Sequence, residues 1–256
     1  DAVSGNNKSL GCAIDSSGIN GDIVVFAGQK PGDPGHNYVY KKVAGVWTKI
    51  SNFSAPVNPN GYDSYNGKGV SIYGNYIAVG RYMANITLNG STYYTGLVDI
   101  FKTTDGGNTW SLVKSIYPHN YSTWPGRFGW STSLHNNTLV VGAPFTGYNS
   151  GSVYIYEKDQ DGPDQWGHVK NVMGDTGYND VYGWGVSVYG DWLCVGAKNY
   201  NDYYGAAYIY QRNEGGTNAW GQTQKIIQSD PQYNDQFGFS VSIYENKLLI
   251  GNHGNI

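Results

Sequence analysis

Side chains that could carry out catalysis are sparse in this sequence of 256 residues. Carboxylates occur in pairs ahead of two similar glycine-containing segments, Asp175 with Asp180 and Asp230 with Asp235. Two carboxylates are what most glycosidases use as acid and as base or nucleophile. Because each pair takes the same place in a repeated segment, and because Asp is a common turn residue, we interpret both pairs as turn formers.

Other catalytic motifs are missing from the sequence. It contains no G-x-S-x-G nucleophile elbow, no phosphate-binding P-loop and no H-E-x-x-H zinc motif. Its five histidines show no metal-ligand spacing, and its three arginines, Arg81, Arg127 and Arg212, are scattered. Residues 15–22 come nearest to a calcium loop, but they hold few acids and misplace the glycine, so calcium there is a minor alternative. We therefore predict a protein that is not an enzyme and binds no metal or cofactor.

The composition predicts strands joined by tight turns. Aromatic residues make up 15% of the chain, with 24 Tyr and 8 Trp, and Gly accounts for 37 residues. Charged residues are only 14%, against about 25% in typical soluble proteins. A net charge of −3 without a Lys/Arg cluster argues against nucleic-acid binding. No apolar run approaches the roughly 18 residues of a membrane span.

A repeated unit organises most of the chain. Similar segments, each opened by a glycine, recur at intervals of roughly 54–62 residues, slightly longer than a four-stranded propeller blade. The glycines are Gly11, Gly67, Gly129, Gly183 and Gly238, of which Gly11 is the poorest match. We predict a single β-propeller domain over residues 1–256, with units starting near residues 11, 67, 129, 183 and 238.

Each unit has the same expected order of strands. An alternating first strand, such as residues 132–134, leads through a short turn to an apolar second strand that ends in Gly, such as residues 139–142. That glycine would let neighbouring backbones approach closely. A third strand, a polar turn, a Trp and a fourth strand follow. We expect one Trp per unit to fill the core between neighbouring sheets: Trp47, Trp110, Trp166 and Trp220.

These motifs resemble a known family. Residues 128–131 (FGWS) followed by residues 141–144 (VGAP) are similar to the FG-GAP repeat of integrin α-subunit propellers. The whole unit resembles more closely the FG-GAP proteins of bacteria, algae and other protists, over about residues 11–251. The resemblance implies an all-β propeller of four-stranded antiparallel blades, with four full repeats and a partial fifth.

Two functions associated with such propellers do not transfer to this sequence. Integrin-type repeats often hold calcium between their first and second strands, but the turns here are too short to supply a ring of oxygen ligands. Residues 103–110 resemble the Asp-box of sialidases, which is a hairpin turn remote from the catalytic site. We therefore expect residues 103–110 to be structural.

Six N-x-S/T sequons, a mild excess over chance, indicate an extracellular glycoprotein. The candidate sites all precede residue 137 and are Asn7, Asn52, Asn85, Asn89, Asn120 and Asn136. The first residue is Asp1 rather than Met, as expected if a leader has been removed. Cys12 and Cys194 lie in apolar strand-like runs, which favours two buried thiols, with a disulfide as the alternative.

The fifth unit holds only two expected strands, so its last strand should present an unpaired edge. The edge residues are Lys247, Leu248, Leu249, Ile250 and Gly251. Three explanations are open. The sequence is a fragment of a longer propeller, the ring closes differently, or a neighbouring chain donates the missing strands. Donation gives a head-to-tail assembly, which forms filaments when it does not close.

The leading prediction is a secreted or cell-surface structural or adhesion protein that is non-catalytic and glycosylated. Its partners would be further copies of itself or other extracellular proteins. A glycan-binding lectin is the alternative, because the Tyr-rich residues 199–204 could stack on sugars, and an enzyme ranks third. The equivalent loops of the other units differ in length and content, which favours assembly over a repeated sugar site.

Overall fold

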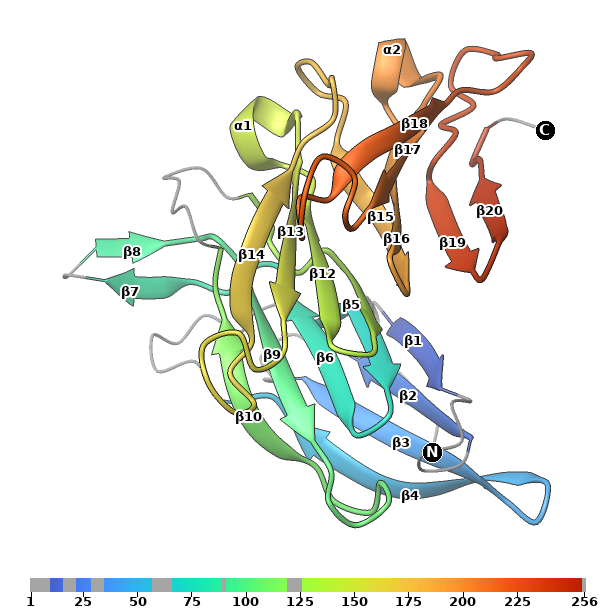
Figure 1. Cartoon of the computed structure of the whole chain (residues 1–256). Coiled ribbons are helices and arrows are strands. Elements are labelled where there is room, and N and C mark those ends of the chain that lie inside the picture. The colour runs from blue at the N-terminus through green and yellow to red at the C-terminus, as the bar shows by residue number, and fades with distance from the viewer. Residues whose placement is uncertain are drawn as a thin grey trace.

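Five successive β units make up the fold in this computed structural model (Figure 1). The structure describes residues 10–15, 22–28, 35–56, 66–88, 91–118 and 126–254. The first four units each form an antiparallel sheet of four strands, and the fifth contributes a two-stranded hairpin. The predicted architecture, an all-β propeller with four full repeats and a partial fifth, is confirmed, and the described sheets do not close into a ring.

The strands of each sheet lie side by side in chain order. The first sheet contains β1 (Leu10–Asp15), β2 (Ile23–Gly28), β3 (His36–Val43) and β4 (Val46–Ser54). The second contains β5 (Asn66–Tyr73), β6 (Tyr76–Arg81), β9 (Leu97–Lys102) and β10 (Ser111–Ile116), with a separate hairpin of β7 (Ile86–Leu88) and β8 (Ser91–Tyr93) inserted. The third contains β11 (Ser131–His135), β12 (Thr138–Ala143), β13 (Ser152–Glu157) and β14 (Gly167–Val172). The fourth contains β15 (Tyr182–Tyr189), β16 (Trp192–Ala197), β17 (Ala206–Gln211) and β18 (Gly221–Ile226), and the fifth unit is β19 (Ser240–Tyr244) and β20 (Lys247–Gly251).

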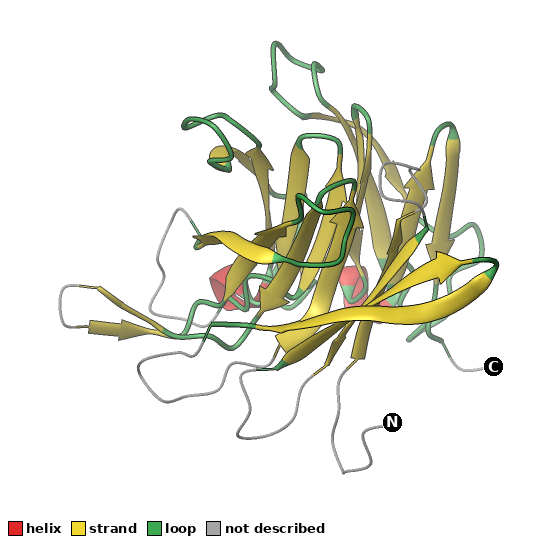
Figure 2. Ribbon diagram, turned by 90° about the horizontal axis from the view of Figure 1, so that it is seen from below, coloured by secondary structure: helices red, strands yellow, loops and turns green. Residues whose placement is uncertain are grey.

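Strands dominate the described residues, and helix is limited to two short turns (Figure 2). These turns, α1 (Thr146–Asn149) and α2 (Tyr200–Tyr203), connect the second and third strands of the third and fourth units. Both contain left-handed backbone, for example at Tyr148 (φ 59°) and Asn201 (φ 51°). Neither they nor any other helix in the described ranges is long and apolar enough to cross a membrane.

The repeated glycines join each unit to the one before it. Gly129 and Gly183 adopt φ values of 87° and 86°, which a side chain rarely tolerates. The second-strand glycines, Gly80 and Gly142, face them so closely that an added Cβ would clash with the Gly129 or Gly183 carbonyl oxygen. The predicted close approach is therefore present, and it occurs between neighbouring units.

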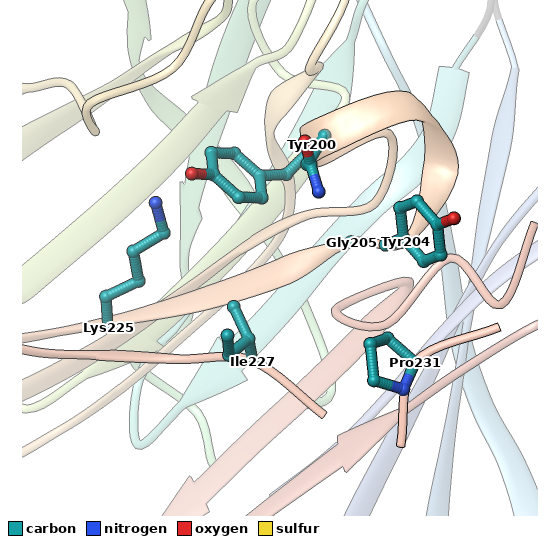
Figure 3. A pocket seen from close by; sticks show the side chains of 7 residues that line it. Tyr200, Tyr204, Gly205, Lys225, Ile227 and Pro231 are labelled. Carbon is teal, nitrogen blue, oxygen red and sulfur yellow. The ribbon is translucent and has the colours of Figure 1, made fainter. Parts of the chain in front are cut away.

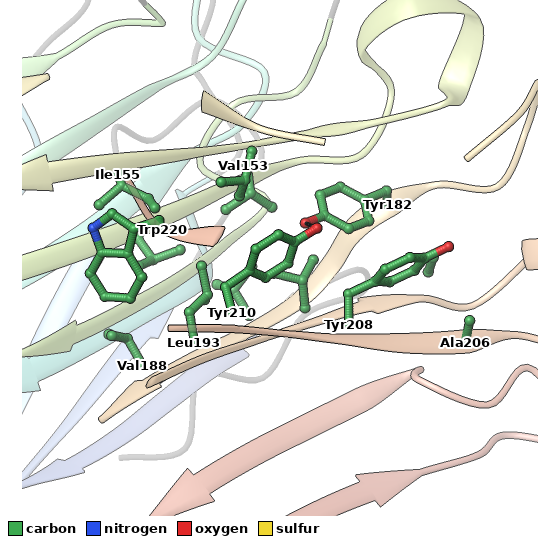
Figure 4. Close-up of a cluster of buried hydrophobic side chains, with 14 residues drawn as sticks. Val153, Ile155, Tyr182, Val188, Leu193, Ala206, Tyr208, Tyr210 and Trp220 are labelled. Atoms are coloured by element: carbon green, nitrogen blue, oxygen red, sulfur yellow. Dashed lines mark hydrogen bonds between the residues drawn. The ribbon is translucent and has the colours of Figure 1, made fainter. Parts of the chain in front are cut away.

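The core lies between successive sheets (Figure 4). Trp220 of the fourth sheet is 1% exposed and packs with Val140, Val153 and Ile155 of the third. Trp166 of the third sheet packs in the same way against the second. Each internal Trp thus fills a junction with the preceding sheet, which confirms the expectation for Trp110, Trp166 and Trp220.

Residues 103–110 form the turn between β9 and β10. Most of its side-chain hydrogen bonds are internal, and two further bonds join it to Lys41 and Asn75. Asp105 accepts hydrogen bonds from the Thr109 backbone N–H at 2.9 Å and from the Thr109 hydroxyl at 2.7 Å. The Thr103 hydroxyl accepts the Gly107 N–H at 2.9 Å, and the Trp110 indole donates to the Gly107 carbonyl at 3.0 Å. The resemblance to an Asp-box therefore marks a structural turn.

Candidate functional site

The β20 strand presents an open edge at one end of the row of sheets (Figure 1). β20 pairs with β19 from Lys247 to Gly251, and no other described strand pairs with it. The five predicted edge residues are therefore brought together on one strand. Such an edge carries unpaired backbone N–H and C=O groups that favour the addition of another strand.

The side chains of β20 are apolar on both faces, but only one face is covered. Leu248 and Ile250 pack against Cys194, Ala207 and Ile209 of the fourth sheet. Leu249 points to the other face and is 73% exposed. A pocket of about 500 Å³ lies beside the edge, lined in part by the side chains of Ile209, Ile226 and Leu248. The β20 strand therefore carries apolar side chains on both faces, as expected of a strand that is covered on both sides.

The equivalents of Leu249 in the second, third and fourth units are fully buried. Counting back from the glycine that ends each second strand, they are Ala78, Val140 and Cys194. All three are 0% exposed, and each packs in a cluster with the following unit. Leu249 therefore occupies a position that contacts the following unit at the junctions of the second, third and fourth units with their successors.

At the opposite end of the row, the first sheet exposes a Trp whose equivalents in the next three sheets are buried. Trp47 is 41% exposed, whereas Trp110, Trp166 and Trp220 are between 1% and 8% exposed. The expectation that Trp47 fills a core is wrong for this conformation. The reason is that each internal Trp packs on the preceding unit, and no described strand precedes the first sheet. Val43 and Val46 beside it are also exposed, at 51% and 65%.

A pocket of about 620 Å³ lies at the Tyr-rich segment (Figure 3). It is lined by Tyr200, Asn201, Tyr204, Gly205, Lys225, Ile227 and Pro231. Lys225 Nζ lies 3.6 Å from the Tyr200 ring centroid and 2.9 Å from Asp175 Oδ1. The face of Tyr200 and the charge of Lys225 are therefore already engaged within the chain.

The candidate glycosylation sites lie in different surroundings. Asn52 is exposed on β4, and Asn136 is exposed in the turn between β11 and β12. Asn85 is only 5% exposed. Asn7, Asn89 and Asn120 lie outside the described residues. Glycosylation at each of these sites stays a prediction.

The acidic pairs and Cys194 have structural surroundings. Asp180 accepts the Gly177 N–H at 2.6 Å, and Asp235 accepts the Gln232 N–H at 2.7 Å, so these two close turns as expected. The expectation is wrong for the Asp175 carboxylate, which instead accepts the Tyr208 hydroxyl at 2.8 Å and the Lys225 ammonium at 2.9 Å. Cys194 is a free, buried cysteine, and burial raises the pKa of its thiol to about 12. The side chain of Cys12 lies outside the described part.

In the described ranges, no group of three or more His, Cys, Asp or Glu side chains is placed to hold a metal ion. Most of the minor calcium candidate, residues 16–21, falls outside those ranges. The predictions of no metal and no cofactor therefore stay predictions.

Sequence reasoning identified the β20 edge but missed the exposed face of the first sheet. The signal that could have found it is that each Trp packs against the preceding unit rather than the following one. A Trp in the first unit, Trp47, would then have no preceding described unit to pack against. That direction becomes visible only when the clusters of three junctions are compared.

Comparison with known proteins agrees with this architecture. The family model described as FG-GAP repeat matches residues 125–156 and 220–255. Among solved structures, Sqt1 from Chaetomium thermophilum is similar, with a TM-score of 0.51 and 14% sequence identity. The similarity covers 88% of this chain and 51% of that one, so this chain spans about half its length. At this identity the likeness concerns the fold alone. A search of curated proteins finds no match.

Proposed function

We propose that this chain, which carries FG-GAP repeats on a β-propeller fold, is an extracellular structural or adhesion protein that assembles head to tail. The FG-GAP fold supports a non-enzymatic protein, and FG-GAP repeats are typical of extracellular proteins. In the assembly, the fifth unit of one copy packs against the first sheet of the next. The same ends would accept other extracellular partners in an adhesion role.

One observation carries this proposal. Two repeat positions, each buried at three internal junctions, are exposed at opposite ends of the row, Leu249 at 73% and Trp47 at 41%. Leu249 stands where a following unit packs, and Trp47 stands where a preceding unit packs. One end exposes a position that contacts a following unit, and the other end exposes a position that contacts a preceding unit. A heterologous contact between identical copies requires two such different surfaces.

The experiment is light scattering and electron microscopy of the 256-residue chain over a range of concentrations. We expect the mass to rise with concentration and open chains of particles to form. Leu249→Lys and Trp47→Ala should each abolish growth, because each blocks one end. An equimolar mixture of the two variants should form dimers and nothing larger, because one intact end of each kind remains.

A matched control is Tyr178→Lys, which changes an exposed aromatic residue (78%) that belongs to neither end. This variant should assemble like the unchanged chain. A monodisperse monomer at every concentration would contradict self-assembly. Homodimers of either single variant would contradict the head-to-tail geometry.

Glycan binding at the Tyr200 pocket is the second candidate function. The pocket in Figure 3 has the volume of a small-ligand site, about 620 Å³, and is lined by two Tyr side chains. A glycan array probed with the unchanged chain and with Tyr204→Ala tests it. Binding that Tyr204→Ala removes would favour the lectin function over assembly.

A further inference from the structure

Residues that follow the unit-opening glycines form a continuous row across the sheets. In four successive units these residues are Lys68, Trp130, Trp184 and Phe239. Lys68 Nζ lies 3.3 Å from the Trp130 ring centroid, the Trp130 and Trp184 centroids are 4.6 Å apart, and those of Trp184 and Phe239 are 5.8 Å apart. The repeat thus places one cation and three aromatic rings next to one another.

Two further cations join this row from neighbouring loops. The Arg127 guanidinium carbon lies 5.6 Å from the Trp130 centroid, and Lys198 Nζ lies 4.4 Å from the Trp184 centroid. Lys68 Nζ is also 4.8 Å from the Trp184 centroid. Three positive charges from three units therefore share two indole rings. We name Lys68, Arg127, Trp130, Trp184 and Lys198 the cation–aromatic cluster.

None of the three cations has a carboxylate partner among the residues that the structure describes. The ion pairs found there involve other lysines and arginines, namely Lys42, Arg81, Lys102, Lys158, Arg212 and Lys225. Lys198 Nζ donates to the neutral Asn199 side chain at 2.7 Å. Three like charges without a counter-ion repel one another, and a bound anion would relieve that repulsion.

Two further observations concern Lys68 and Trp130 of the cluster. Loss of water around Lys68, followed by the charges of Arg127 and Lys198, lowers the pKa of its ammonium to about 8. The Trp130 side chain is 6% exposed, and its indole N–H has no hydrogen-bond partner among the described residues. The indole N–H groups of the core residues Trp166 and Trp220 also have no partner there, so this N–H alone does not indicate a ligand, and the three cations without a counter-ion do.

We propose that the cation–aromatic cluster binds a carboxylate side chain of an acidic polypeptide segment. An Arg guanidinium matches a carboxylate with two parallel hydrogen bonds, and the two ammonium groups add charge. Trp and Arg are also the residue types that dominate binding energy at protein interfaces. Sugar stacking is disfavoured because Lys68 already lies over Trp130 and Lys198 over Trp184.

The surface is open enough for such a ligand. Lys68 is exposed, and Trp184, Lys198 and Phe239 are partly exposed. This site is separate from the two ends proposed for assembly, because neither Trp47 nor Leu249 belongs to the cluster. A negative result for peptide binding would therefore not contradict the proposed assembly. A negative result for assembly would not contradict this binding site.

The test is titration of the whole chain with a synthetic ten-residue glutamate peptide, followed by Trp fluorescence and calorimetry. We expect saturable one-to-one binding that weakens as salt is raised, since charge attraction is screened. Lys198→Gln and Lys68→Gln should each weaken binding roughly tenfold, as expected for the loss of one charged hydrogen bond. Lys198→Arg, which keeps the charge, should retain most of the affinity.

Lys49→Gln is the matched control. Lys49 Nζ also lies over an aromatic ring, 4.8 Å from the Tyr38 centroid, but on the first sheet and apart from the cluster. This variant should bind the peptide like the unchanged chain. Circular dichroism checks that each variant is folded, and the exposed Lys68 and partly exposed Lys198 make both substitutions mild.

Three results would overturn the proposal. Absence of peptide binding at low salt is the first. Equal weakening by Lys49→Gln and Lys198→Gln is the second, because it would mean non-specific charge attraction. The third is binding of a sulfated oligosaccharide in preference to the peptide, which would replace the acidic segment with an anionic glycan.

Discussion

At the scale of single residues, several carboxylates of this chain close turns. Asp180 and Asp235 take the same place in successive units, and each accepts a backbone N–H three residues earlier in the chain. Asp105 also closes a turn, the one between β9 and β10, where it accepts the backbone N–H and the hydroxyl of Thr109 four residues later. The hydrogen bonds from Thr109, with smaller contributions from Thr103 and Asn108, lower the pKa of Asp105 to about 2.

The Asp105 carboxylate should therefore stabilise the fold in a pH-dependent way. Because its folded pKa lies below the ordinary value of 3.8, the contribution is present above about pH 4 and is lost as the pH falls toward 2. We expect Asp105→Ala to lower the Tm by a few degrees at pH 7 and by progressively less below pH 4. Thermal melts from pH 2 to pH 7 measure this difference.

Asp161→Ala is the control for this measurement. Asp161 is exposed, and its carboxylate accepts no hydrogen bond within the described residues. Its substitution should leave the Tm nearly unchanged over the same range. A deficit for Asp105→Ala that stays constant down to pH 2 would show that the carboxylate charge is not what stabilises the turn.

At the scale of elements, the junction between two units rests on paired glycines. The second-strand glycine of one sheet lies against the unit-opening glycine of the next, as Gly142 lies against Gly183. Side chains of the first strands strengthen the junction. The Ser133 hydroxyl accepts the Val188 N–H at 3.0 Å, and Ser187 accepts the Ile243 N–H at 3.0 Å.

Gly142→Ala should destabilise the protein by about 1–3 kcal/mol, the usual range for overpacking a filled site. The added methyl group would meet the Gly183 carbonyl oxygen, which belongs to the backbone and cannot easily move away. Chemical denaturation measures the change in the free energy of unfolding. Gly177→Ala is the control, because the nearest atom to its added Cβ is 3.8 Å away. Equal stabilities of the two variants would contradict close packing at the junction.

The sequence predicted what depends on local pattern and not what depends on how units meet. The alternation of polar and apolar residues at 132–134 and the apolar run at 139–142 both lie within one unit. The type and order of the strands could therefore be predicted from the sequence. The β7–β8 hairpin was missed because it interrupts one unit and has no repeat partner. The cation–aromatic cluster was missed because Lys68 reaches Trp130, and Trp130 reaches Trp184, only when neighbouring sheets pack.

At the scale of the whole molecule, the row of sheets has two unlike ends. The open edge that includes Leu249 was predicted from the missing strands of the fifth unit, whereas the exposure of Trp47 was not, because a Trp at this repeat position was expected to be buried. Ring closure also could not be predicted, since the angle between sheets is set by packing rather than by any single unit. The glycosylation pattern is a further property at this scale.

We expect glycosylation to follow exposure when the chain is secreted from a eukaryotic host. Asn52 and Asn136 are exposed, whereas Asn85 is 5% exposed, so the first two should be modified more completely. Asn52→Gln and Asn136→Gln should each lower the intact mass by one glycan, and Asn85→Gln should change it little. Mass spectrometry before and after enzymatic deglycosylation measures this. Full occupancy at Asn85 would mean that its glycan is added before the second sheet folds.

The glycine pairs also bear on how such a chain can change in length over evolution. Because the junctions of the second, third and fourth units with their successors use the same glycine contact, one whole unit can be gained or lost by recombination between repeats without creating a new kind of junction. Such an event would leave the first sheet and the β19–β20 hairpin at the two ends. The length of the row of sheets would change in steps of one unit, while each remaining junction would keep the same glycine contact.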